Sequence, residues 1–182
     1  MIDDELLAIF EPTLEPLGFR TEDGEDYRDP PLDVLRYYRR PVRLHWLPMI
    51  GQAQAVVAVV RQPVDLDGTE AGCRKLLDRL AGAVNGRFPP SWGLGWGSVG
   101  LTTVVLTPEP IAAEDDAKLG AGLKASLRSR VVPLALVRLN LGQEAMAFQL
   151  AGGPDGLFPE PLALVDALTS KFRRFVPMID WD

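Results

Sequence analysis

Apolar residues recur with a helical period in four segments of the chain. These segments are residues 3 to 17, 65 to 86, 109 to 130 and 159 to 175. In the second segment Asp67 and Glu70 have the spacing of an N-terminal capping box, and the apolar stripe comprises Cys73, Leu76, Leu77, Leu80 and Val84. In the third, Gly120 and Gly122 each disfavour a helix by about 1 kcal/mol relative to alanine, so packing must hold it. We expect four helices.

Shorter runs between these segments have the alternating or continuous apolar character of strands. We expect a short pair of strands around a turn at 23 to 24, then strands at 32 to 40, 42 to 47, 52 to 62, 101 to 108 and two within 131 to 150, joined near Leu141 and Gly142. Pro41 should interrupt the chain between two of them, and the run at 52 to 62 is apolar on both faces and should be the most buried.

This order of elements predicts an α+β fold in one domain that spans residues 1 to 182. We expect a single, mostly antiparallel sheet of about five to seven strands, with the helices packed mainly on one face. The order is similar to that of small acidic secretion chaperones and toxin-neutralising proteins. This likeness concerns architecture only, because no motif supports it.

Charge is unevenly distributed along the chain, whose net charge is −6. Residues 1 to 33 carry eleven acids and two bases, whereas residues 34 to 61 carry five arginines and no acid. The arginines at 36 to 43 are interleaved with aromatic residues, a pattern that can hold phosphates and stack on bases. Alternatively, the two oppositely charged segments pair as neighbouring strands. We favour pairing and do not expect nucleic acid as a partner, because an acidic protein repels a polyanion at long range.

The glycine spacing of residues 95 to 100, GWGSVG, fits a dinucleotide-binding loop. In such a loop the glycines leave a strand and open a helix, whose N-terminus holds the pyrophosphate. Here the segment follows a helix and leads into a strand, so we expect no nucleotide cofactor. The same loop carries Trp92 and Trp96, which either cover the core or anchor a partner.

Candidates for catalysis are few. The chain has one histidine and one cysteine, and Cys73 lies in the middle of an apolar stripe, where a core role is expected. No CxxC, HExxH or GxSxG motif occurs, so we assign no catalytic residue, metal or cofactor, although a site built from carboxylates alone stays open. His45 is either a general base or a polar surface residue.

The features that bear on location favour the cytoplasm. The first residues lack the positive region of a secretory signal, no apolar run reaches the roughly 20 residues needed to cross a bilayer, and one cysteine cannot form an internal disulfide. The excess of 15 arginines over 4 lysines is typical of a GC-rich bacterial source.

We therefore expect a cytoplasmic, non-enzymatic protein-binding module of the chaperone-like or toxin-neutralising type, which holds a partner protein. This hypothesis allows the module to be a homodimer. An acidic surface with exposed tryptophans suits a partner with a basic, partly apolar patch. The candidate contact residues are Trp92, Trp96, His45, Trp46, Arg39 and Arg43. The alternative is a small-ligand-binding protein or an enzyme, with a carboxylate and histidine site under residues 91 to 100. A third reading, RNA binding, requires Arg36, Arg39, Arg40 and Arg43 to be exposed and unpaired.

Overall fold

The computed structural model describes residues 2–22, 32–43, 52–62, 66, 68–88, 98–108, 110, 113–125, 130–140, 145–151 and 161–171. Within them six strands form one sheet, with bounds β1 Arg20–Thr21, β2 Val34–Arg43, β3 Gln52–Arg61, β4 Val99–Leu106, β5 Val131–Asn140 and β6 Ala145–Leu150. The helices are α1 Ile2–Leu14, α2 Glu70–Arg87, α3 Ala113–Ala125 and α4 Pro161–Lys171, and a short 3₁₀ helix, η1 Glu15–Leu17, follows α1.

The strands lie in the sheet in the same order as in the sequence. Strands β3, β4 and β5 run parallel, and α2 and α3 connect them, whereas the pairs β1·β2, β2·β3 and β5·β6 are antiparallel. The α+β class and the strand number are confirmed, and three of the five strand pairings are antiparallel. The hairpin of β5 and β6 and the short strand β1 are confirmed as well, while the expected return strand after the turn at 23 to 24 lies outside the described residues.

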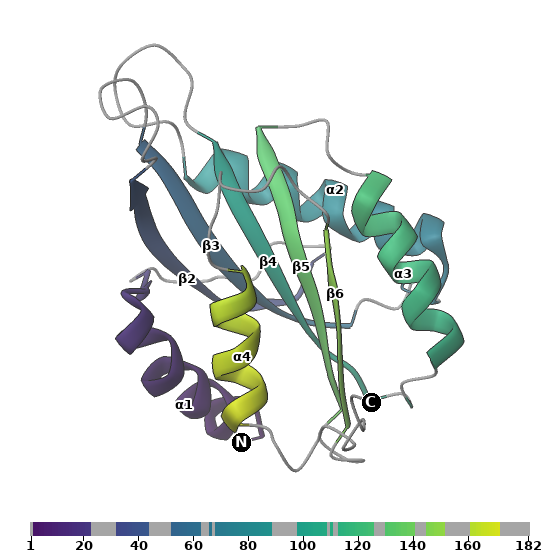
Figure 1. The fold of residues 1–182 in the computed structure, drawn as a ribbon, viewed down its shortest axis with the longest axis horizontal. Helices are drawn as coiled ribbons and strands as arrows, with labels where there is room; N and C mark the ends of the chain where they lie inside the picture. Colours follow the sequence, from purple (N-terminus) through teal and green to yellow (C-terminus); the bar gives the residue numbers. More distant parts are fainter. Residues whose placement is uncertain are drawn as a thin grey trace, which may run out of the picture.

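Helices cover both faces of the sheet, two on each (Figure 1). One core forms between the sheet and α1 with α4, and the other forms between the sheet and α2 with α3. This corrects the expectation of helices mainly on one face. The physical reason lies in the central strands: β4 is buried at all eight positions, so both of its sides must be covered. It is β4, therefore, and not β3, that is the most buried strand.

Strand β2 continues through Pro41, which corrects the expected interruption. Pro41 pairs with Gln54 of β3 without a break. The backbone N–H of Glu22 donates to the carbonyl oxygen of Tyr37. Because bonded positions alternate in an antiparallel ladder, Tyr37, Arg39 and Pro41 direct their backbone groups toward the β1 edge of the sheet, away from β3. Pro41 is tolerated because the N–H that proline lacks would point away from β3 and would not take part in the β2·β3 ladder.

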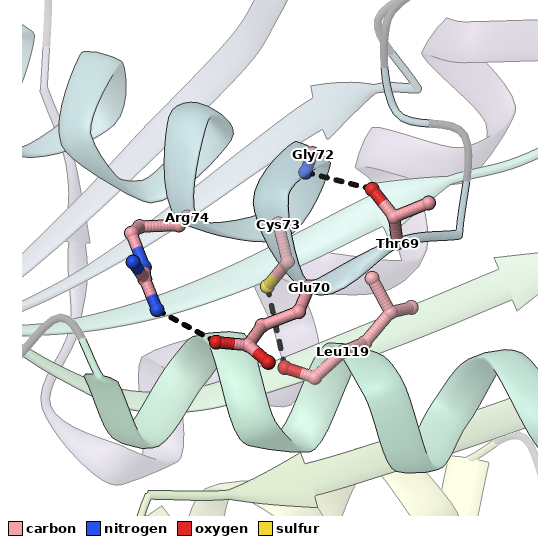
Figure 2. Close-up of polar contacts among 6 residues, drawn as sticks. All are labelled: Thr69, Glu70, Gly72, Cys73, Arg74 and Leu119. Carbon is pink, nitrogen blue, oxygen red and sulfur yellow. Dashed lines mark hydrogen bonds and ion pairs between the residues drawn. The ribbon is translucent and has the colours of Figure 1, made fainter.

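Local chemistry defines the ends of two helices. Thr69 is the N-cap of α2, because its hydroxyl oxygen accepts the N–H of Gly72 at 3.0 Å (Figure 2). The cap is thus not the predicted Asp67, which lies outside the described residues. Gly18 ends η1 in the left-handed conformation with φ of 81°, which a residue with a Cβ rarely adopts.

Close packing holds α3, as the sequence required. A Cβ on Gly122 would lie 2.8 Å from the carbonyl oxygen of Glu70 and 2.9 Å from the Cβ of Cys73, both on α2. A Cβ on Gly120 would lie 2.7 Å from the side-chain oxygen of Gln149 on β6. The two glycines weaken the isolated helix, but Gly122 lets it approach α2 closely, whereas the atom nearest to Gly120 is the end of a flexible side chain.

Candidate functional site

Of the predicted contact residues, Arg39 and the backbone of Arg43 belong to the described part of the chain. Trp92, Trp96, His45 and Trp46 lie outside the described residues, and only the backbone of Arg43 is described, at the end of β2. The described residues that flank these segments lie at the same end of the sheet: Arg43 pairs with Gln52, and the N–H of Gln54 donates to the carbonyl oxygen of Ser98 at 3.1 Å. That the tryptophans and the histidine form a common site stays a prediction.

The arginines of β2 point alternately to the two faces of the sheet. Arg40 lies on the side of α1, where it donates to the carbonyl oxygen of Leu17 at 2.7 Å and stacks 5.2 Å from the ring centre of Phe19. Burial lowers the pKa of Arg40 from its ordinary value. Arg40 therefore ties η1 to the sheet, which is a structural role.

Arg39 lies on the opposite face and is held from two sides. Its Nε forms an ion pair with Glu22 at 2.6 Å, and its guanidinium lies 5.7 Å from the ring centre of Phe88 at the end of α2. Phe88 in turn packs edge-on against Tyr37, and Arg87 stacks on Tyr37. Glu22 belongs to the acidic N-terminal segment, so this ion pair is of the intrachain kind that we favoured. With Arg39 and Arg40 both engaged, the condition for an RNA-binding stripe is not met.

A hollow of about 620 Å³ opens at this edge of the sheet. It is lined by Gly18, Arg20, Thr21, Glu22, Arg39, Arg40 and Pro41, and is called the arginine hollow below. Among the described residues, three arginines and one glutamate give its lining a formal charge of +2 in a chain of net charge −6. The hollow is thus a local positive site on an acidic protein.

The charges of the described residues that line the arginine hollow are not balanced. Arg20 of β1 stands directly opposite Arg39 of β2, and like charges in that arrangement destabilise a sheet. Glu22 neutralises Arg39, but Arg20 is exposed and its side chain has no ion pair or hydrogen bond in the described part of the chain. An anion held between the two guanidiniums would relieve the repulsion. The arrangement therefore favours binding of a carboxylate or a similar anion.

Sequence reasoning named Arg39 but missed Arg20. Arg20 is one of two bases among eleven acids in residues 1 to 33, so the charge of the segment concealed it. The signal that could have found it is the pairing of β1 with β2, which places Arg20 against the arginine run. Only the register shows that the two arginines are direct partners.

A second hollow, of about 470 Å³, is lined by Ala71, Arg74, Lys75, Asp78 and Arg79. All five residues belong to α2, and Arg74 pairs with Glu70 of the same helix at 2.6 Å. Its charges are mixed and come from a single element. This surface has the character of a solvated helix face rather than of a site.

A row of polar residues lies at the carboxyl ends of the parallel strands, where open α/β sheets commonly bind ligands. Thr107, Arg138 and Asn140 are at most 4% exposed, and each has an interaction partner within the protein. Gln62 donates to the carbonyl oxygen of Leu66 at 3.2 Å. Because each of these residues has at least one interaction partner within the protein, we interpret the row as part of the core.

The thiol of Cys73 is not placed for chemistry. It is fully buried on α2, and its Sγ donates to the carbonyl oxygen of Leu119 on α3 at 3.3 Å (Figure 2). Burial, and secondarily the charge of Glu70, raises the pKa of Cys73 to about 11, so the thiol stays protonated at neutral pH. The core role predicted for Cys73 is confirmed.

Neither a metal-binding cluster nor a membrane-spanning helix occurs among the described residues. No group of three His, Cys, Asp or Glu residues among them is placed to hold a metal ion. No helix in this part of the chain is both long enough and apolar enough to cross a membrane.

Comparison with known proteins adds no relative. No family model matches the chain, and neither a curated protein nor a solved structure is significantly similar to it. The functional argument therefore rests on the geometry and charge of the residues themselves.

Proposed function

We propose that this protein is a non-enzymatic binding module that holds a partner protein, and that the arginine hollow receives an acidic segment of that partner, in place of the basic patch that the acidic character of the chain led us to expect. The observation that carries the proposal is the direct opposition of Arg20 and Arg39 in an open hollow, whose described lining contains one glutamate to balance them. Guanidinium groups bind carboxylates through paired hydrogen bonds, and they are less strongly hydrated than lysine.

The charge of the whole chain sets the kind of anion that fits. At physiological ionic strength charges farther than about 8 Å apart are largely screened, so the local charge of the hollow acts on a short acidic segment. A long polyanion also meets the net charge of −6 of the whole chain. A peptide with a few carboxylates fits this balance better than a nucleic acid does.

The backbone at this edge favours side-chain recognition over strand addition. Strand β1 has two residues, and Pro41 removes the outward N–H at the next bonding position along β2. An added strand would find an interrupted ladder here. Binding would depend on the guanidiniums, so removal of one of them should be measurable.

The test is a binding titration with two labelled peptides, one of alternating glutamate and glycine and one with glutamine in place of glutamate, followed by fluorescence anisotropy. The glutamate peptide should bind more tightly. Arg20→Gln should weaken its binding about tenfold, which corresponds to ~1.4 kcal/mol. Arg74→Gln is the matched control, because it removes the same charge from the exposed face of α2 and should leave binding unchanged.

Two results would contradict the proposal. One is equal binding of the two peptides, and the other is an equal loss for both arginine variants, which would show an effect of net charge only. Tighter binding of an RNA oligonucleotide of equal charge would show that the class of partner is wrong.

A small-ligand or enzymatic site under residues 91 to 100 is the second candidate. It is favoured by one observation, namely that the residues flanking this segment and His45 lie at the same end of the sheet. A thermal-shift screen against metals, nucleotides and metabolites tests it, because a ligand of the folded state raises the melting temperature. A shift that His45→Ala abolishes would support this candidate, and a shift that the variant leaves intact would contradict the role of His45.

The proposed setting is the bacterial cytoplasm. The single cysteine supports it, since a cytoplasmic protein keeps its thiols reduced, and so does the excess of arginine over lysine in the chain.

A further inference from the structure

We propose that the outer edge of β6 is a self-association surface, at which β6 pairs antiparallel with β6 of a second copy of this chain. Strand β6 is the last strand of the sheet, and within the described residues no strand pairs with its outer side. This surface is independent of the arginine hollow, which lies at the opposite edge of the sheet.

The hydrogen-bond alternation of β6 leaves backbone groups directed outward. The N–H of Ala151 donates to the carbonyl oxygen of Leu134, and the ladder with β5 continues from there without a bulge. Because bonded positions alternate in an antiparallel ladder, Met146, Phe148 and Leu150 direct their N–H and C=O groups away from β5. The six-residue strand thus offers three regularly spaced positions for a further strand.

The composition of β6 lacks the devices that commonly protect a sheet edge. Its sequence AMAFQL contains no charge and no proline. The opposite edge has both kinds of protection, in the arginines of β1 and β2 and in Pro41. Phe148, moreover, is 39% exposed and is the one large hydrophobic residue that is exposed in the described part of the chain.

A second copy is the occupant that best fits these properties. An antiparallel pair of identical strands is related by a two-fold axis, and an axis at Phe148 sets Phe148 against Phe148 and Met146 against Leu150. All outward positions then bond in pairs, which gives about six hydrogen bonds between the copies. The two Phe148 rings would lie side by side on one face and cover each other.

The charge distribution is compatible with the same occupant. Each copy carries a net charge of −6, so contact between two copies requires a surface without local charge. The uncharged β6 meets this requirement. On the face opposite Phe148, β6 is covered by α3, where the side chain of Gln149 lies against Gly120. The strand is thus supported from one side and its edge is left for a partner.

Sedimentation equilibrium of the full chain tests the proposal. The wild-type chain, of 19.9 kDa, should reach twice this mass as its concentration rises. Phe148→Lys should stay monomeric, because it sets two like charges against each other across the axis. Ala71→Lys on α2 is the matched control, since it adds the same charge to an exposed position and should dimerise like the wild type.

A second measurement uses the wild-type chain alone, so it does not depend on whether a variant folds. Amide hydrogen exchange followed by NMR should show that protection of the Met146, Phe148 and Leu150 amides increases with protein concentration. Three results would overturn the proposal: a wild-type chain that is monomeric at all concentrations, a dimer that Phe148→Lys leaves intact, or β6 protection that is independent of concentration. If the wild-type chain dimerises but either of the last two results is found, the interface lies elsewhere.

Discussion

Alanine at Gly122 should destabilise the protein, although alanine is the better helix former. Gly122 lies where α3 meets α2, and its missing side chain is the reason for the close approach. Gly82 on α2 provides the matched comparison, because a Cβ built there has no atom within 4 Å. Gly82→Ala gains the helix propensity alone, whereas Gly122→Ala gains the same propensity and loses packing.

The magnitude follows from the contacts. Replacement of a helical glycine by alanine stabilises by about 1 kcal/mol when space is free. At Gly122 the new Cβ would lie 2.8 Å from the carbonyl oxygen of Glu70 and 2.9 Å from the Cβ of Cys73. Neither atom is the end of a flexible side chain, so the helices must separate, at an overpacking cost of about 1 to 3 kcal/mol. The propensity cancels between the variants, and the overpacking cost is their difference.

Urea unfolding of the two variants and the wild type measures this difference. With a slope of about 2 kcal/mol per molar urea, the midpoints of the two variants should lie about 0.5 to 1.5 M apart, with Gly122→Ala the less stable. Equal midpoints, or a Gly122→Ala midpoint above that of Gly82→Ala, would refute the close helix contact as the reason for this glycine.

Three further predictions concern local interactions. Thr69→Ala should lower the unfolding free energy by about 1 kcal/mol through loss of the N-cap of α2, and Thr69→Ser should retain most of it in the same urea assay. Cys73 should resist a thiol reagent in the native protein and react on unfolding, and rapid labelling of the native protein would contradict its burial. Because folding raises the pKa of Cys73 from 9.0 to about 11, the free energy of unfolding should fall as the pH rises between these values, and it should fall less in Cys73→Ala. Arg130→Gln should lower the melting temperature, because Arg130 donates to Asn85 Oδ1 at 2.7 Å and to the carbonyl oxygen of Phe88 at 3.0 Å, and an unchanged melting temperature would show that these bonds contribute little.

The elements of the fold were largely predictable because their patterns are local. The apolar stripe of α2 and the run in β3 that is apolar on both faces can be read directly from the chain. The observed N-cap, Thr69, lies two residues after the predicted one, Asp67, because both residue types cap helices and spacing alone does not choose between them. The placement of α1 and α4 on the face opposite α2 was missed, since it depends on the three-dimensional path of the chain.

The candidate site was predictable only in part. Arg39 was named from the alternation of charged and aromatic residues in β2, and its contact with the acidic segment follows from charge. Arg20 was not found, because its significance depends on the register that sets it opposite Arg39. Pro41 was expected to break the strand, and only the direction of its missing N–H explains why it does not.

The central claim is that an acidic peptide binds at the arginine hollow. The measurement that tests it most directly is a titration of the ¹⁵N-labelled chain with the glutamate peptide, followed by amide chemical shifts. The account predicts shifts confined to the amides of residues that line the hollow, and their loss in Arg20→Gln; these residues are Gly18, Arg20, Thr21, Glu22, Arg39 and Arg40. Shifts centred on residues 71 to 79 of α2, or no shifts at a peptide concentration that changes the anisotropy, would contradict it.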